Sequence, residues 1–182
     1  MALWIIIAVV VLLVVMYISI YNKIIKMKNR FEASFAQIDA HLKQRYDLIP
    51  NLVEIVKGYA KHEKETLTAV IQARNTALNA TNQSEKEAAD KSLAGALKSV
   101  FALAESYPDL KANEGFVKLQ TQLTQIEDQI LQARKYYNAV IREFNNLVEV
   151  FPSSIVASMM HQAKRPYLEV EEVERKRVDI KF

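Results

Sequence analysis

The fold of this chain is decided by Leu3–Ile20, which reads LWIIIAVVVLLVVMYISI. The run contains no charged residue, and Ser19 is its only clearly polar side chain. As an α-helix, about 18 residues would span ~27 Å, which is close to the hydrocarbon thickness of a bilayer. We therefore expect a membrane-spanning helix at the start of the chain.

A cleaved signal peptide is the alternative interpretation of this run. It would need a basic segment in front and a small-residue cleavage site behind. Met1–Ala2 carry no basic side chain, and no such site follows, so an uncleaved span is favoured. The positive-inside rule then places the N-terminus outside and the rest of the chain in the cytoplasm, because basic residues directly follow the run: Lys23, Lys26, Lys28 and Arg30.

Composition predicts an all-α chain. Only 3 Gly and 4 Pro occur among 182 residues, and good helix formers are abundant. The absence of Cys excludes disulfides and thiolate metal sites. A net charge of +3 is too small to predict nucleic-acid binding.

Hydrophobic periodicity divides the remainder into four helices. The first continues from the membrane span to about Tyr46, and we expect it to break at Asp47–Pro50, because Pro fits the first turn of a new helix. The third helix is expected to begin at Ser84, with Glu87 completing a capping box. It should stop at Tyr107–Asp109.

The fourth helix has the most regular pattern in the chain, a heptad-like, coiled-coil spacing of three and four. Asn113 is its expected cap and Pro152 its expected end. The apolar positions are Leu123, Ile126, Ile130, Ala133, Tyr137, Val140, Phe144, Leu147 and Phe151.

The predicted fold is thus a transmembrane helix continuous with an antiparallel, up-and-down four-helix bundle. We expect three regions: residues 1–22 as the span, 23–152 as the bundle, and 153–182 as an amphipathic and charged tail. The tail ends in a strand-like alternation of Val178, Ile180 and Phe182.

Several motifs resemble the LemA family. The longest is residues 37–53, QIDAHLKQRYDLIPNLV, and others lie at residues 56–63 and 107–113 and at Arg134, Tyr137–Asn138 and Phe151–Pro152. The resemblance covers nearly the whole chain, except that the part after His161 matches less well. It implies a bacterial plasma-membrane protein with a short external N-terminus and an internal helical bundle. The family's function is poorly defined, although relatives occur in magnetosome formation.

Catalytic and metal-binding patterns are missing from the sequence. No Glu-x-x-His pair precedes His41, His62 or His161, which argues against a di-iron site. His62–Glu63 fails as a zincin motif because Thr66 stands where the second His is needed. We expect no enzyme activity, no cofactor and no metal.

Two arginines, Arg74 and Arg134, lie near apolar helix faces. They are expected to form structural salt bridges rather than to bind a ligand. The candidate partners are Asp39, Glu54 and Glu127.

Two candidate sites follow from the predicted topology. The turns near residues 46–51 and 107–113 would meet at the bundle tip farthest from the membrane, and their polar residues would form a partner-docking surface or serve only as caps. The tip residues are Arg45, Tyr46, Asp47, Asn51, Asp109 and Asn113. The tail would touch lipid headgroups or pack against the base of the bundle through Ile155, Val156, Met159 and Met160.

The favoured function is a structural or interaction scaffold anchored in the lipid bilayer. We expect it to form homo-oligomers and to bind an unidentified membrane-associated protein. The alternative is a sensor in which binding at the tip is relayed along the first helix.

Overall fold

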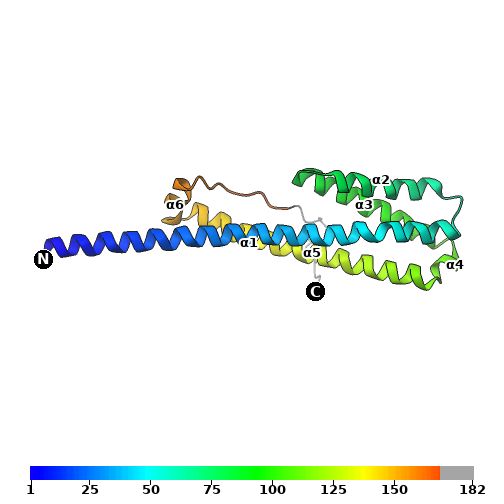
Figure 1. Cartoon of the computed structure of the whole chain (residues 1–182), viewed down its shortest axis with the longest axis horizontal. Helices are drawn as coiled ribbons and strands as arrows, with labels where there is room; N and C mark the ends of the chain where they lie inside the picture. Colours follow the sequence, from blue (N-terminus) through cyan, green and yellow to red (C-terminus); the bar gives the residue numbers. More distant parts are fainter. Residues whose placement is uncertain (169–182) are drawn as a thin grey trace, which may run out of the picture. The chain divides into compact units, whose positions relative to one another are not determined.

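The computed structural model describes residues 1–168 and confirms the all-α class. Six helices follow one another in the described chain, which contains no strand (Figure 1). They are α1 (Ala2–Tyr59), α2 (Lys64–Asn79), α3 (Gln83–Ala104), α4 (Pro108–Lys111), α5 (Glu114–Glu149) and α6 (Ser153–Met159). The predicted strand-like alternation of Val178, Ile180 and Phe182 lies outside the described residues.

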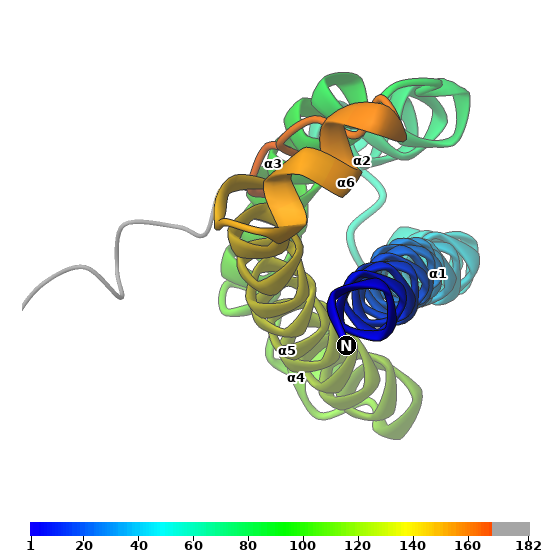
Figure 2. The same ribbon diagram turned by 90° about the vertical axis from the view of Figure 1, so that its left-hand side faces the viewer.

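The beginning of α1, where the N-terminus lies (Figures 1 and 2), carries large apolar side chains that are exposed within residues 1–168. An 18-residue window of this helix has a mean hydropathy of 3.1, and none of it is buried. By length and composition the helix can therefore cross a membrane, although a signal sequence near an N-terminus would meet the same criterion.

The predicted break at Asp47–Pro50 is wrong, because α1 runs through Pro50 to Tyr59. Proline has no N–H, so the carbonyl of Tyr46, four residues earlier, loses its helical donor. Arg74 on α2 replaces that donor: its Nε lies 2.8 Å from the Tyr46 carbonyl oxygen. A side chain from the neighbouring helix thus compensates for the missing N–H, and the helix continues.

The turn that was expected at residue 47 occurs at residues 60–63. The Ala60 N–H donates the last α-helical bond of this segment to Val56 O, at 2.8 Å. The second helix therefore begins at Lys64 rather than at Pro50.

Helix caps were predicted with mixed success. The capping box of α3 uses Asn82 and Glu85, not Ser84 and Glu87. Asn82 Oδ1 accepts from the Glu85 N–H at 2.9 Å, and Glu85 Oε2 accepts from the Asn82 N–H at 3.4 Å. At the start of α5 the expected cap is confirmed, because Asn113 Oδ1 accepts from the Phe116 N–H at 3.0 Å.

The chain forms two compact units. Unit 2 is Asp39–Ile130, and unit 1 combines Met1–Ile38 with the described residues from Leu131 onward. Within unit 2, α1, α2, α3 and α5 succeed one another in alternating directions (Figure 1). The core of unit 2 includes Leu42, Ile49, Leu52, Val56, Leu67, Val70, Leu93, Leu97, Val100, Leu110, Phe116, Leu119 and Leu123.

Unit 1 buries the second half of the regular pattern predicted for α5. Ala133, Tyr137, Val140 and Phe144 are all buried, and Phe31 of α1 meets Phe144 edge-on with ring centroids 5.3 Å apart. Phe151 departs from the pattern: it follows the end of α5 and is 76% exposed.

Candidate functional site

The structure separates the six residues predicted for the distal tip. Arg45, Tyr46, Asp47 and Asn51 lie in the interior of α1, because the helix does not turn there. Only Asp109 and Asn113 lie at the turn between α3 and α5. The six residues therefore do not form one tip surface.

The turn near Asn113 meets the turn between α1 and α2. Tyr107 Oη donates to Glu63 Oε1 at 3.1 Å, and Asn113 Nδ2 donates to Tyr59 Oη at 3.0 Å. The hydrogen bond to Glu63 raises the pKa of Tyr107 above its ordinary value. These two hydrogen bonds join the α1–α2 turn to the α3–α5 turn, which fits the capping interpretation of Asn113.

Arg45 ties three helices of unit 2 together. It is 2% exposed, and its Nη1 lies 2.9 Å from Asp90 Oδ1 on α3 and 3.0 Å from Glu127 Oε2 on α5. Asp90 is 4% exposed, so the Arg45–Asp90 pair is buried, whereas Glu127 remains in contact with solvent. A buried pair of this kind selects one arrangement of the helices, because separating two opposite charges in the interior is strongly unfavourable.

Sequence reasoning missed the buried Arg45. Glu127, one of the candidate partners of Arg74 and Arg134, pairs with Arg45, and Asp39, another candidate, pairs with Lys86 at 2.9 Å. The available signal was the register of Arg45, which falls between Leu42 and Ile49 on the buried face of α1. A charged residue at an apolar position of a helix indicates a buried partner.

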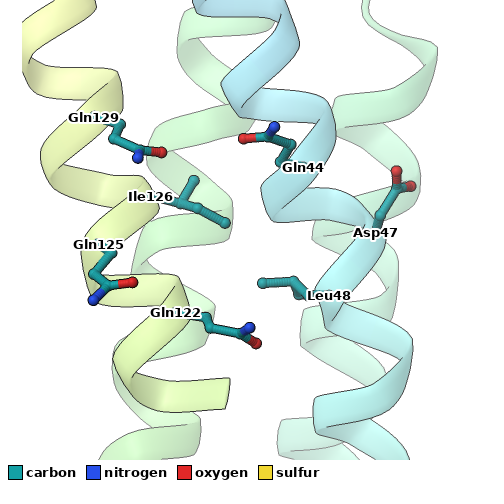
Figure 3. A pocket seen from close by; sticks show the side chains of 7 residues that line it. All are labelled: Gln44, Asp47, Leu48, Gln122, Gln125, Ile126 and Gln129. Atoms are coloured by element: carbon teal, nitrogen blue, oxygen red, sulfur yellow. The ribbon is translucent and has the colours of Figure 1, made fainter. Parts of the chain in front are cut away.

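An open groove runs between α1 and α5 in unit 2 (Figure 3). Its volume is about 420 Å³. Four of its side chains are carboxamides, and the apolar side chains of Leu48 and Ile126 project between them (Figure 3). The lining residues are Gln44, Asp47, Leu48, Gln122, Gln125, Ile126 and Gln129.

The chemistry of this groove suits recognition rather than catalysis. Carboxamides both donate and accept hydrogen bonds, and Asp47 is the only titratable side chain in the lining. Sequence reasoning missed the groove except for Asp47. The signal was present as Gln122, Gln125 and Gln129, whose spacings of three and four place them on one helix face.

The predicted membrane-contact residues of the tail divide between two environments. Ile155 and Met159 are exposed on α6, while Val156 is only 5% exposed and packs inside unit 1. Met160 is half-buried. Val156 therefore follows the packing alternative, and Ile155 and Met159 remain candidates for lipid contact.

Beyond α6, the chain lies against α5 through two asparagines. Asn145 exchanges two hydrogen bonds with the main chain of Arg165, and Asn138 exchanges two with the main chain of Leu168. Nearby, Lys164 pairs with Glu149, and that hydrogen bond raises the pKa of Lys164.

In residues 1–168, no group of three or more His, Asp or Glu side chains could hold a metal ion.

Comparison with known proteins agrees with the motifs of the sequence. Residues 34–182 match the LemA family. Over 167 residues, the chain is 28% identical to Protein LemA of Metamycoplasma hominis, an alignment that covers 90% of this chain and 75% of that protein. The match spans most of the chain, from residue 34 onward, including all of unit 2, and the chain belongs to the LemA family.

Proposed function

We propose that this protein is a scaffold of the bacterial plasma membrane that presents unit 2 to a protein partner in the cytoplasm. One observation carries the proposal. A single uninterrupted helix, α1, contains both the exposed apolar segment and the residues Gln44, Asp47 and Leu48 of the groove. An anchored helix that also lines a recognition surface has the properties of a docking module.

The character of the groove supports a protein partner. A row of carboxamides with two apolar side chains between them can hydrogen-bond to a polar peptide or helix surface while burying a small apolar contact. The lining offers no pair of acid and base and no activated nucleophile of the kind that catalysis requires. We therefore propose a binding role and not an enzymatic one.

The membrane orientation can be tested with single cysteines, because the natural chain contains none. We expect Ala2→Cys to react with a membrane-impermeant maleimide in intact cells. Lys61→Cys, in the exposed turn after α1, should react only after the cells are permeabilised. Labelling of Lys61→Cys in intact cells would overturn the orientation, and recovery of the chain in the soluble fraction would overturn the anchoring.

The groove can be tested with a photo-crosslinking amino acid at position 125. The matched control carries the same amino acid at Lys98, which is exposed on α3 and does not line the groove. We expect discrete adducts from position 125 only. Equal adducts from both positions would contradict a docking role for the groove, whereas adducts containing only this chain would assign the groove to self-association.

Self-association is part of the proposal. Three exposed apolar side chains of unit 1 offer contact area for a second copy or for lipid headgroups: Phe151, Ile155 and Met159. Stepwise photobleaching of a labelled chain in membranes distinguishes monomers from oligomers, and single bleaching steps throughout would refute self-association. Loss of anionic-liposome binding in Ile155→Asp/Met159→Asp would support the lipid contact.

A sensor is the second candidate, and Arg45 is the observation that favours it. This residue links α1 to α3 and α5 by ion pairs, so a ligand that altered those pairs would act on the helix that carries the apolar segment. A ligand-dependent rise in thermal stability that Arg45→Met abolishes would support the sensor over the scaffold.

A further inference from the structure

Asn138 and Asn145 of α5 form what we call the asparagine clamp. Asn145 Nδ2 donates to Arg165 O at 2.9 Å, and Asn145 Oδ1 accepts from the Arg165 N–H at 2.8 Å. Asn138 repeats the arrangement on Leu168, with distances of 3.0 Å to its carbonyl oxygen and 2.9 Å to its N–H. Each carboxamide thus pairs with one residue's main chain, as a neighbouring β-strand would.

The spacing of the clamp matches an extended peptide. Asn138 and Asn145 are seven residues apart, which is two helical turns or ~10.5 Å along α5. Arg165 and Leu168 are three residues apart, and three residues of extended chain also span ~10 Å. Both repeats of the arrangement can therefore be satisfied only by an extended segment.

The side chains of the bound segment add selectivity. Leu168 is buried in unit 1, and the Arg165 guanidinium lies over the Phe31 ring, 5.5 Å from its centroid. Pro166, between the two clamped residues, is exposed and has no N–H to satisfy. The ligand of the clamp is thus an extended segment with a basic residue three positions before an apolar one.

We propose that the asparagine clamp is a docking site that also accepts the Arg165–Leu168 segment of a second copy of this chain, so that exchanged segments join neighbouring copies. The clamp already holds this chain's own segment, and every copy in a membrane presents the same one. Exchange between two copies forms the same four hydrogen bonds that form within one copy, so swapping associates the copies with little loss of free energy.

Two features of the segment favour exchange. It is joined to α5 by side chains alone and belongs to no helix, so its release disrupts no helical hydrogen bond. It also follows a defined pivot: α6 ends in a Schellman motif with His161 at φ 51°, where Gln162 N–H donates to Ala157 O at 2.9 Å. The proposal deepens the self-association proposed above and rests on it.

The test uses two differently tagged full-length copies, one with Arg142→Cys and one with Tyr167→Cys, expressed together and treated in membranes with a short bismaleimide. Arg142 is exposed on α5, four residues after Asn138 and three before Asn145, and Tyr167 is exposed beside Leu168. Because the chain has no other cysteine, a product carrying both tags reports a segment in the clamp of another copy. A chain carrying both cysteines gives the cis product for reference.

We expect the two-tag product to form and to fall at least fivefold when Asn138→Ala and Asn145→Ala are placed in the copy that carries Arg142→Cys. Asn146→Ala, an exposed neighbour outside the clamp, should leave it unchanged. If the double variant loses helix content, Leu168→Asp in the other copy gives the same answer, since it alters only the donated segment.

The proposal is overturned if the natural clamp gives no more two-tag product than the Asn138→Ala/Asn145→Ala clamp does, while the chain with both cysteines still forms its cis product. If photobleaching still shows oligomers in that case, self-association stands and segment exchange fails. If photobleaching shows only monomers, the proposed self-association itself has failed.

Discussion

The two units of this protein bury polar groups of opposite kinds. In unit 2 the buried polar residues of the described chain are charged, Arg45 and Asp90, whereas in unit 1 they are neutral, Ser34, Asn145 and Ser153. Three charged pairs of unit 1 are exposed: Lys28 with Glu32, Arg30 with Glu143, and Lys164 with Glu149. A buried ion pair resists rearrangement because each charge needs the other. A carboxamide that is hydrogen-bonded to main-chain groups can exchange those bonds for bonds to water with little loss of free energy.

This difference predicts that unit 2 is the stable helical platform and that the tail of unit 1 is exchangeable. It also agrees with the proposed roles, since a docking groove needs fixed helices and segment exchange needs a releasable ligand. Four experiments test the comparison.

The largest effect is expected from Arg45→Met, which removes the buried guanidinium that lies 2.9 Å from Asp90 Oδ1. The free energy of unfolding should fall by about 3–5 kcal/mol, measured by urea denaturation of the full chain in detergent. Arg30→Met is the matched control, because Arg30 forms its contacts with Glu143 and Tyr136 at an exposed site, and we expect a far smaller loss. Adding Asp90→Leu to Arg45→Met should restore most of the loss. Equal effects of the two arginine variants would contradict the comparison.

The next effect concerns Arg74, which donates to a carbonyl rather than to a charge. Arg74→Met should cost about 1–3 kcal/mol, because the Tyr46 carbonyl loses the guanidinium N–H that takes the place of the donor missing at Pro50. In a Pro50→Ala background, the alanine N–H supplies that bond, so the same substitution should cost about 1 kcal/mol less. Urea denaturation of the four chains of this cycle gives the coupling directly. Additive effects would show that Arg74 does not compensate for Pro50.

The contrast between Pro50 and Asn113 shows where sequence reasoning succeeds. Asn113 was identified correctly because a helix cap is a local interaction, settled within four residues. The same holds for the apolar run of α1 and for the buried face of α5, which periodicity alone identifies. Pro50 was misjudged because its compensation comes from Arg74 on another helix, and no local rule contains that contact.

The errors at α3 and at the clamp have different causes. Asn82–Glu85 and Ser84–Glu87 are both acceptable capping boxes, and the sequence does not choose between two that overlap. Asn138 and Asn145 flank an apolar face, where amides ordinarily face solvent. Their function depends on a segment twenty or more residues away that adopts an extended conformation, and helical periodicity carries no information about it.

A smaller effect is expected when the neutral contact of unit 1 is removed. Asn145→Ala should lower the free energy of unfolding by about 1 kcal/mol, because the main chain of Arg165 is hydrogen-bonded by water instead. The Arg165–Leu168 segment should also dissociate from α5 more often. Trypsin cleavage after Lys164 should therefore accelerate by roughly tenfold for each 1.4 kcal/mol of lost docking energy. Asn146→Ala is the control and should be cleaved at the natural rate; protection in Asn145→Ala would refute the releasable segment.

The smallest effect is expected from Glu85, an exposed charge of unit 2, in contrast to the buried charge of Arg45. Glu85 accepts hydrogen bonds from the main-chain N–H groups of Thr81 and Asn82, which lower its pKa below the usual value near 4.5. A lowered pKa in the folded state stabilises the protein above the unfolded pKa, and this contribution is lost as the pH falls through the folded value. Wild type should therefore melt slightly above Glu85→Gln at pH 7, and the two melting temperatures should converge near pH 3. Because the carboxylate is exposed, the difference at pH 7 should be far smaller than that caused by Arg45→Met. A difference that persists unchanged at pH 3 would show that the cap acts through shape and not through the charge of Glu85.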